Sequence, residues 1–455
     1  MDSPMKSTID ASSWSPAQPA TVNRALFKKI ALRILPLIFV AYVFAFLDRV
    51  NIGYAKLQML PDLGITQSQY GFAAGIFFIG YALFEIPSNL LLDKIGARKT
   101  MTRIMLLWGL ASAATMLVTT AQQLYLIRLL LGIFEAGFFP GVILYLSYWF
   151  PSYLRGRVTS TLMLATLVAP ILGGPVSGLI MEGMNGVAGW AGWQWLFLLE
   201  AVPIMIIGIV CFMILCDHPE QAGWLSDEEK TLHRNLMADD AASQTPDPGN
   251  CHSGQAIFSA LVDPRVYVLA FLYFSCALGS YAFNFWLPSM IQKLGVASIT
   301  QISLYAMIPF NCAGLGMILI GRSSDLRRER RLHYCLSVLF GAAMLSLSTL
   351  TTSLGLTLAL LGGAAFGFSG AVIVCWAIPA TYLKDKSAPA GIALVSSLGS
   401  LCGFAAPSII GLARDITGKD HAGLYVISLI MVVAAGAMLT LMPRQALTVG
   451  KPGQE

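Results

Sequence analysis

Long stretches without a charged residue constrain the fold of this chain more than any other feature. Met105–Ala121, Ala201–Cys216 and Leu336–Tyr382 contain no Asp, Glu, Lys or Arg. Because the hydrocarbon core of a bilayer is about 30 Å thick, roughly 20 apolar residues of helix cross it. Leu336–Tyr382 is long enough for two such helices, with a turn at Thr351–Gly355. Only 12% of the residues are charged, against about 25% in soluble domains. The sequence therefore predicts an all-α polytopic membrane protein.

Twelve transmembrane helices are predicted, in two sets of six. The first set covers residues 31–52, 69–92, 101–120, 122–146, 157–181 and 194–216, and the second covers 266–290, 301–321, 333–351, 354–382, 389–412 and 422–442. A polar segment between the sets is typical of a linker. The predicted division is an N-terminal tail (1–30), a six-helix bundle (31–216), a linker (217–265), a second six-helix bundle (266–442) and a C-terminal tail (443–455).

The distribution of basic residues predicts the orientation, because Lys and Arg are retained on the cytoplasmic side of a membrane. Most of the 29 Lys and Arg residues fall in the tails, the linker and the loops on the same side. The loops on the opposite side hold only Lys56, Lys293, Arg414 and Lys419. Both termini and the linker are therefore expected in the cytoplasm, in a multi-pass protein of the cell inner membrane.

The two sets of helices repeat one another. Three pairs of residues in matching loops and helices share an offset of 232: Asp93 with Asp325 (325 − 93), Arg98 with Arg330 (330 − 98), and Pro175 with Pro407 (407 − 175). A pattern that recurs at one offset in both halves indicates two copies of a six-helix unit. Parallel repeats of this kind build transporters whose binding site lies between the halves, near the middle of the membrane.

The repeated loop resembles the signature of the major facilitator superfamily, G-x-x-x-D-(R/K)-x-G-x-(R/K)-(R/K). Asn89 replaces the first Gly of the signature, and Arg328 replaces the later Gly in the second copy. The resemblance implies two pseudo-symmetric six-helix bundles. It also implies that Asp93, Arg98, Asp325 and Arg330 act in gating, through ion pairs and helix caps at the cytoplasmic ends of helices. A role in fixing the topology alone is the other interpretation of these charges.

Finer features resemble the anion:cation symporter family within that superfamily, which includes permeases for phthalate, tartrate and sugar acids. The matching stretches are Phe46–Asn51, Glu85–Asn89, Arg128–Gly141, Asp217–Glu220, Phe285–Pro288 and Trp376–Ala380. They extend over nearly the whole chain. The resemblance implies a transporter of small organic anions.

Charged residues within the predicted helices are the main functional candidates, because each costs at least about 2.5–3.5 kcal/mol at the centre of a membrane. Arg128 and Glu135 are seven residues apart, which is two helical turns on one face. Asp48 and Arg49 are adjacent and point about 100° apart. These four residues either form structural ion pairs or transport the substrate. The resemblance implies that Arg49 holds the substrate carboxylate, that Asp48 and Glu135 carry protons, and that Arg128 couples them.

Polar and aromatic residues complete the candidate binding site. Tyr81 matches a substrate-contacting tyrosine of the family. The candidates in the second half are Tyr281, Asn284, Asn311, Ser369, Trp376, Ser396 and Ser397. Relatives commonly carry Asn in the place of Ser396 and Ser400. Serine is shorter and lacks the amide group, so a polar contact to the ligand differs, and the identity of the substrate stays open. Glu85 and Glu200 are interpreted as structural or gating residues.

The predicted function is proton-coupled uptake of a small organic carboxylate, such as a hydroxy diacid like tartrate, a sugar acid or an aromatic acid like phthalate. A proton-antiport exporter is the alternative, although Arg49 and Arg128 argue against a site for cationic drugs. The eight Cys residues lack the spacing of a metal site, and no nucleotide-binding or catalytic motif is present. We therefore expect no cofactor, no nucleic-acid partner and no enzymatic activity, and we expect a monomer in the lipid bilayer.

Overall fold

The computed structural model describes residues 20–243, 254–383, 388–419 and 421–442. Within these ranges the regular structure is helical, and twelve segments are long and apolar enough to cross a membrane, which confirms the predicted fold class. The helices of the first half are α1 (Ala20–Leu63), α2 (Gln67–Ile95), α3 (Ala97–Ala114), α4 (Ala121–Glu135), α5 (Phe138–Trp149), α6 (Ser152–Met163), α7 (Ala165–Gly183) and α8 (Gly192–Ile214).

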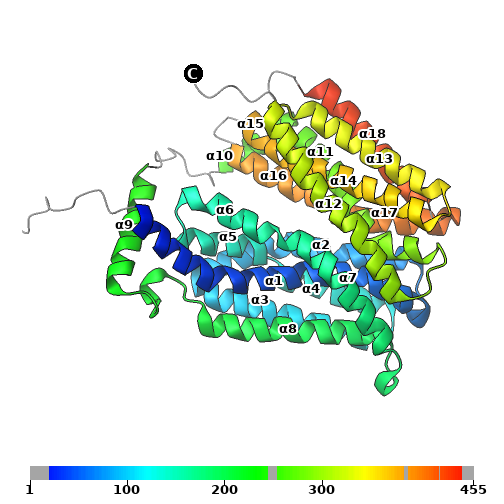
Figure 1. Ribbon diagram of the computed structural model, residues 1–455, viewed down its shortest axis with the longest axis horizontal. Coiled ribbons are helices and arrows are strands. Elements are labelled where there is room, and N and C mark those ends of the chain that lie inside the picture. The colour runs from blue at the N-terminus through cyan, green and yellow to red at the C-terminus, as the bar shows by residue number, and fades with distance from the viewer. Residues whose placement is uncertain (1–19, 244–253, 384–387, 420, 443–455) are drawn as a thin grey trace, which may run out of the picture.

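The helices of the second half are α11 (Pro264–Gln292), α12 (Ile299–Arg327), α13 (Arg331–Leu347), α14 (Leu354–Ala377), α15 (Pro379–Tyr382), α16 (Ala388–Ser400), α17 (Cys402–Thr417) and α18 (Ala422–Leu441). Figure 1 shows the two halves as separate groups of helices that lie side by side. Between the groups, α2 packs along α17 and α7 packs along α12. The two halves therefore meet along two matching helix pairs and also where α1 packs on α11.

Several helix bounds differ from those predicted from the sequence. Helix α1 extends from Ala20 to Leu63, well beyond the predicted 31–52, because its polar ends continue the helix outside the apolar stretch. The predicted helix 122–146 is broken between α4 and α5, where Gly137 adopts a left-handed conformation with φ 83° that L residues with a side chain rarely adopt. The predicted helices 157–181, 354–382 and 389–412 are also divided, at Leu164, Ile378 and Leu401, but the backbone at these three residues stays in the right-handed region.

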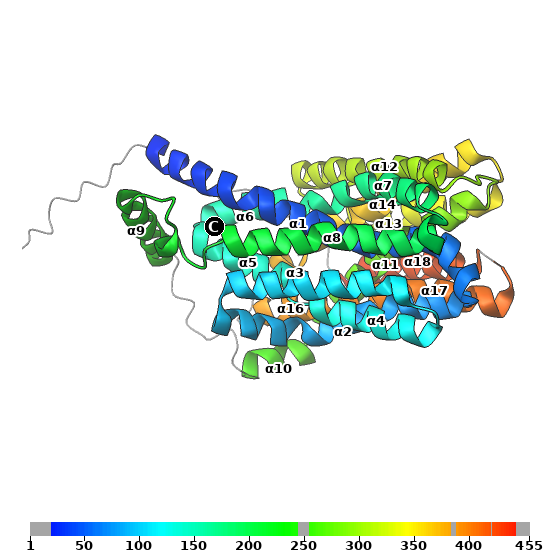
Figure 2. The same ribbon diagram turned by 90° about the horizontal axis from the view of Figure 1, so that it is seen from below.

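The predicted linker contains two further helices, α9 (Asp227–Ser243) and α10 (Gly254–Val262). Figures 1 and 2 both show α9 beside the first turns of α1. Lys29 of α1 pairs with Glu229 of α9 at 2.7 Å, and the Nε2 atom of His233 lies 3.1 Å from the carbonyl oxygen of Trp149. Burial lowers the pKa of His233. Helix α9 is therefore packed against the first half. The predicted tails beyond residues 20 and 442 lie outside the described residues.

The molecule has two distinct ends along its long axis. We call the end that holds α9 the linker end, and the end that holds the turn between α1 and α2, around Gly64, the loop end (Figure 1). The helix pairs α2–α17 and α7–α12 are in backbone contact toward the loop end. A Cβ atom added to Gly178 of α7 would lie 2.9 Å from the Cα atom of Thr300, and one added to Gly411 of α17 would overlap the carbonyl oxygen of Gln67.

Two carboxylates close these contacts at the loop end, and each caps a helix of the opposite half. Glu182 of α7 accepts the backbone N–H of Ile299 at 2.6 Å and the hydroxyl of Thr300 at 2.5 Å, at the start of α12. Asp415 of α17 accepts the backbone N–H of Ser68 at 2.9 Å, at the start of α2. We call these two contacts the end caps. They lie on the matching helices α7 and α17 of the two repeats, with an offset of 233 (415 − 182), one residue more than the offset of 232.

Candidate functional site

An ion pair between α1 and α4 forms the centre of the candidate site. The Nε atom of Arg49 donates to Oε1 of Glu135 at 2.9 Å, and its Nη2 atom contacts the same oxygen. The side chain of Arg49 is 16% exposed and that of Glu135 is 1% exposed. Glu135 is the last residue of α4, directly before the break at Gly137. The pair therefore lies at an irregular point of the bundle, with its basic member partly accessible.

Aromatic rings surround the Arg49 guanidinium. Its Cζ atom lies 5.0 Å from the ring centroid of Phe46, 5.4 Å from that of Phe77 and 5.1 Å from that of Tyr81. The phenol of Tyr281, from the second half, also lies within electrostatic reach of Arg49. Such contacts hold a planar cation in place without neutralising it. The structure thus brings together three residues predicted separately from the sequence, Arg49, Tyr81 and Tyr281.

Asp48 points away from Arg49 into the interior of the first half. Its carboxylate accepts hydrogen bonds from Ser112 at 2.6 Å and from the indole of Trp108 at 3.3 Å, both on α3. A narrow space between α1, α3 and α8 is lined by Asp48 and Glu200. Glu200 is bonded to the hydroxyl of Ser177 at 3.2 Å. The adjacent residues therefore face different partners, as their 100° separation predicts.

Arg128 is buried with no hydrogen-bond partner on any of its guanidinium nitrogens, among the residues that the structure describes. Its Cζ atom lies 5.2 Å from the ring centroid of Phe77, so this one ring contacts the guanidinium groups of both Arg49 and Arg128. Among the acidic groups, Asp48 has the strongest electrostatic interaction with Arg128. Among the described residues, Glu135 is hydrogen-bonded to Arg49 and not to Arg128, and its Oε2 atom has no hydrogen-bond partner.

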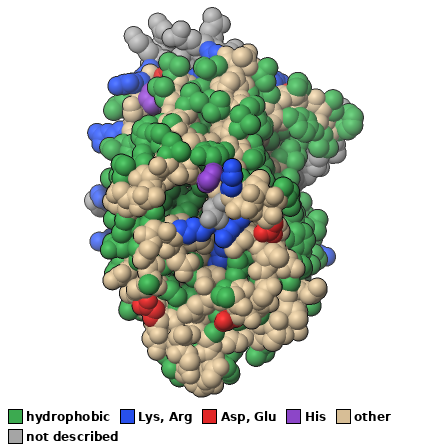
Figure 3. Space-filling model, turned by 90° about the vertical axis from the view of Figure 1, so that its right-hand side faces the viewer, with side chains coloured by type: hydrophobic (Ala, Val, Ile, Leu, Met, Phe, Trp, Pro, Cys, Tyr) green, Lys and Arg blue, Asp and Glu red, His purple; other side chains and the backbone are tan. Residues whose placement is uncertain are grey.

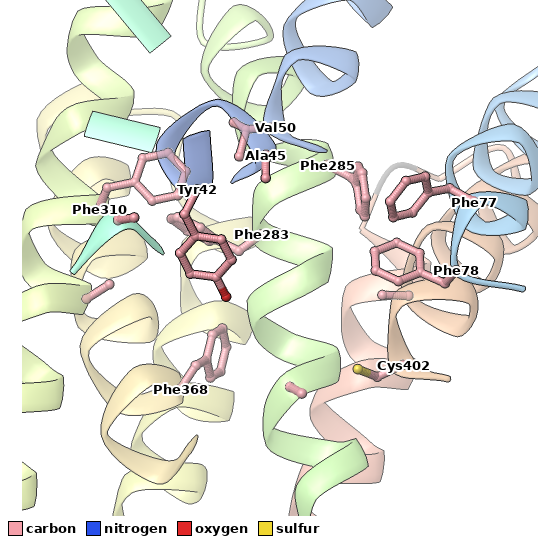
Figure 4. Close-up of a cluster of buried hydrophobic side chains, with 14 of the residues drawn as sticks. Tyr42, Ala45, Val50, Phe77, Phe78, Phe283, Phe285, Phe310, Phe368 and Cys402 are labelled. Atoms are coloured by element: carbon pink, nitrogen blue, oxygen red, sulfur yellow. The ribbon is translucent and has the colours of Figure 1, made fainter. Parts of the chain in front are cut away.

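Aromatic packing of the second half continues this site across the interface. Tyr281 of α11 lies 4.9 Å from Phe78 of α2, ring to ring. Figure 4 shows Phe77 and Phe78 facing Phe285, another residue of α11. A Cβ atom added to Gly53 would lie 2.8 Å from the backbone oxygen of Asn284. The side of α11 that holds Tyr281 therefore forms the wall opposite Arg49.

The other second-half candidates lie further from the ion pair. Trp376 is 40% exposed and packs on Tyr273 at 4.8 Å. Ser396 is half-buried and Ser397 is exposed, on α16. Asn311 is exposed and donates to the carbonyl of Met307, and Ser369 is half-buried on α14. No contact between these residues and Arg49 is present in the described part of the chain.

The predicted gating residues are located at the linker end, and no contact of Arg98, Asp325 or Arg330 with the opposite half is present in the part of the chain that the structure describes. The backbone N–H of Arg98 donates to Asp217 at 2.8 Å, and its side chain donates to the carbonyl of Phe212. Arg330 pairs with Asp325 at 2.5 Å. The side chain of Asp93 lies outside the described residues. Glu85, half-buried on α2, lies within electrostatic reach of Arg49.

Lys56 is a buried cation that the sequence did not identify as a candidate. The prediction that Lys56 lies in a loop is wrong, because α1 continues to Leu63 and Lys56 is 3% exposed inside it. Its ammonium lies 3.9 Å from the ring centroid of Trp286 and 4.8 Å from that of Tyr70. The spacing in the sequence could have indicated this, because Lys56 follows Arg49 by seven residues and therefore shares its helix face. The end-cap residues Glu182 and Asp415 were likewise not singled out from the sequence.

No group of His, Cys, Asp and Glu that could hold a metal ion is present among the described residues. The sequence model of the Major Facilitator Superfamily matches residues 38–407. The chain is 42% identical to a putative metabolite transport protein NicT of Pseudomonas putida, over 92% of this chain and 95% of that protein. It is 42% identical to a putative tartrate transporter of Agrobacterium vitis, over 91% and 94% of the two chains. It is 39% identical to a quinolone resistance transporter of Acinetobacter baumannii, over 92% and 94%.

Solved structures with the same fold include a bacterial homologue of the human lysosomal transporter Spinster in an inward-facing, unoccupied conformation. The TM-score is 0.77 at 14% identity, over 94% of this chain and 99% of that chain. A D-xylose–proton symporter has a TM-score of 0.69 at 15% identity, over 92% and 100% of the two chains. At this identity the likeness establishes the fold alone.

Proposed function

The chain belongs to the Major Facilitator Superfamily, so it is a multi-pass membrane transporter of a small molecule and not an enzyme, and we propose that it imports a small organic carboxylate together with protons. Relatives named as putative tartrate transporters support an anionic substrate. The proposed substrate classes are hydroxy diacids, sugar acids and aromatic acids. We further propose that the transporter works as a monomer.

The observation that carries this proposal is the Arg49–Glu135 ion pair. A guanidinium has a planar set of donors that matches a carboxylate, and here it holds the carboxylate of Glu135 instead of a ligand. A substrate carboxylate would replace Glu135 at the same donors, between the rings of Phe77, Tyr81 and Tyr281. The aromatic walls would suit the carbon skeleton of the substrate. Glu135 thus occupies the site that the proposed substrate needs.

Charge balance provides the reason for proton coupling. Asp48, Arg49, Arg128 and Glu135 sum to zero when all four are ionised. A carboxylate that enters this poorly solvated region adds one negative charge, and an uncompensated charge within a membrane is costly. A proton on Glu135 or Asp48 would restore the balance, and it would also release Glu135 from Arg49. One proton per carboxylate charge follows as the proposed minimum.

We propose that the linker end faces the cytoplasm of a bacterial inner membrane, with both termini on that side. The distribution of Lys and Arg supports this orientation. The loop end then faces outward. Because the halves are in contact through the end caps at the loop end, this conformation would be closed to the outside, and the gating residues at the linker end would be separated from the opposite half.

A proton-driven exporter is the second candidate, because one relative is named a quinolone resistance transporter. The two candidates differ in the direction of transport, and an exporter of cationic drugs would also need a site that accepts the opposite charge. Arg128 is a buried cation and Arg49 is a partly exposed one, both in the first half, and they would repel a cationic drug. Uptake of the carboxylate classes therefore remains the better-supported proposal.

Transport in proteoliposomes tests the proposal. Arg49→Gln should lose binding and uptake of carboxylates, because the donor set is removed. Glu135→Gln should retain exchange of internal for external substrate but lose accumulation driven by a proton gradient, because the amide cannot carry the proton. Glu229→Gln, a carboxylate on α9 outside the spans, is the matched control and should behave like the native protein. Unchanged proton-driven uptake in both site variants would refute the assignment.

A further inference from the structure

Helix α1 carries a second buried cation on the face that holds Arg49. Lys56 follows Arg49 by seven residues, which places it two turns, about 10.5 Å, further along the same face of the helix. The displacement is toward the loop end, because α1 ends there at Leu63. Lys56 is 3% exposed. A row of two cations therefore runs along α1 from the middle of the bundle toward the outer end.

The surroundings of the two cations match one another. On α2, which runs antiparallel to α1, Phe77 contacts Arg49 at 5.4 Å and Tyr70 contacts Lys56 at 4.8 Å. These two aromatic residues are again seven apart. The hydroxyl of Tyr70 donates to the carbonyl of Ile52 at 3.0 Å, which fixes the ring. The contact of Arg49 with an aromatic ring of α2 is thus repeated two turns outward at Lys56.

The opposite half covers this second cation. The Lys56 ammonium lies 3.9 Å from the ring centroid of Trp286 of α11, and Trp286 also packs on Tyr70 at 5.5 Å. Trp286 belongs to the second half, whereas Lys56 and Tyr70 belong to the first. When the halves part at the loop end, Trp286 would move away from Lys56, and Tyr70 would stay beside it.

A pocket at the loop end reaches Trp286 from the outside. It has a volume of about 160 Å³, and its lining includes Trp286 together with Lys293 and His421. Hydroxyl groups of Ser289, Ser348 and Thr357 belong to residues that line it as well. Figure 3 shows a hollow on this face with Lys, Arg and His side chains around it. One side chain, Trp286, therefore borders both a basic pocket that opens outward and the buried Lys56.

We propose that Lys56 is the outer carboxylate-binding residue of the transporter, which receives the substrate anion when the halves part at the loop end and passes it to Arg49. An ammonium group pairs with a carboxylate as a compact cation. Lys56 lies on the face of α1 that holds Arg49, where the second half covers it with Trp286. This inference rests on the proposed function, since it takes the substrate to be a carboxylate.

Initial rates of uptake against external substrate concentration test the inference. Lys56→Gln should raise the KM for external substrate about tenfold, with a smaller effect on kcat, because the first binding residue is lost. Lys56→Arg should keep a KM near that of the native protein. Trp286→Leu should leave this KM unchanged or lower it, because it uncovers Lys56. Lys419→Gln, at an exposed cation of the same end, controls for the general surface charge.

The raised KM expected for Lys56→Gln, and the unchanged or lowered KM expected for Trp286→Leu, separate binding from a structural contact between the halves. If Lys56 only held the halves together, both variants would remove the same contact and change the KM in the same direction, which would overturn the inference. Should Lys56→Gln fail to fold, a raised KM in Trp286→Leu would have the same meaning. Stabilisation of the purified protein by a carboxylate depends on Arg49 and should persist in Lys56→Gln. Absence of carboxylate uptake by the native protein would instead refute the proposed function, and this inference with it.

Discussion

The two end caps are expected to open and close together, and this cooperation can be measured. Glu182 caps α12 and Asp415 caps α2, each across the boundary between the halves. Because both contacts lie at the loop end, the halves cannot part there while either cap persists. Removing one carboxylate should therefore weaken the opposite cap as well, although the mutated residue does not touch it.

The size of the effect follows from the contacts. A carboxylate at an exposed helix N-terminus contributes about 0.3–1 kcal/mol through the helix dipole, and a hydrogen bond to a charged group adds about 1.5–3 kcal/mol when it is shielded from water. Both residues are exposed, so solvent screening reduces the sum, and we take about 1 kcal/mol for each cap. That free energy corresponds to about a fivefold change in the population open at the loop end, and both caps together to about thirtyfold if they add.

Hydrogen exchange of the capped amides provides the assay. The backbone N–H of Ile299 and that of Ser68 are the groups that the carboxylates hold. Asp415→Asn should speed exchange at Ile299 about fivefold, and Glu182→Gln should do the same at Ser68. Asp62→Asn is the matched control, because Asp62 is a carboxylate near the loop end that accepts the indole N–H of Trp193 within its own half, at 2.7 Å.

A change confined to the mutated cap would refute this reasoning, because it would mean that each cap frays alone while the halves stay together. An equal effect of Asp62→Asn at both amides would refute it as well, since that variant leaves the contacts between the halves intact. The double variant should exceed either single variant at both amides. Its failure to do so would indicate that other contacts hold the loop end closed.

Two further predictions follow from packing and from burial. Gly411→Ala should speed hydrogen exchange at Ser68 even with both caps intact, because the added Cβ overlaps the carbonyl oxygen of Gln67 and pushes α17 away from α2. Gly436→Ala is the control and should have no effect, because an added Cβ there meets nothing within 4 Å. Burial lowers the pKa of His233, so docking of α9 favours the neutral imidazole and should weaken as the pH falls below the ordinary value of about 6.5. Faster proteolysis of α9 at pH 5.5 than at pH 7.5, lost in His233→Phe, would verify the sign, and faster proteolysis at the higher pH would contradict it.

Hydrophobicity was sufficient to locate the twelve membrane helices, because the cost of a charge in lipid acts on each residue separately. From the sequence alone, the same cost indicates four candidate functional residues: Asp48, Arg49, Arg128 and Glu135. Helix geometry then predicted that Asp48 and Arg49 have different partners, and the structure places Asp48 against α3 and Arg49 against Glu135.

The contact partners of individual side chains and the ends of the helices could not be predicted in this way, because they depend on tertiary contacts. The predicted helix 31–52 leaves Lys56 in a loop, whereas in the structure the rings of Tyr70 and Trp286 contact Lys56 inside α1. Glu182 and Asp415 resemble ordinary exposed carboxylates in the sequence. Their role depends on the close approach at Gly178 and Gly411, which brings a helix N-terminus of the other half within reach.

The proposed coupling has a definite sign, which follows from the unpartnered guanidinium of Arg128. In this conformation Arg49 is neutralised by Glu135, and Asp48 is the main negative charge near Arg128. A proton on Asp48 would leave the charge of Arg128 uncompensated. A unit charge about 10 Å away contributes about 1.7 kcal/mol at an effective dielectric constant of about 20, so an anion at Arg49 would bind more than tenfold more tightly. By linkage the anion favours the proton equally. Under the proposed mechanism the two would enter together, which is symport, whereas a cation at this site would expel the proton.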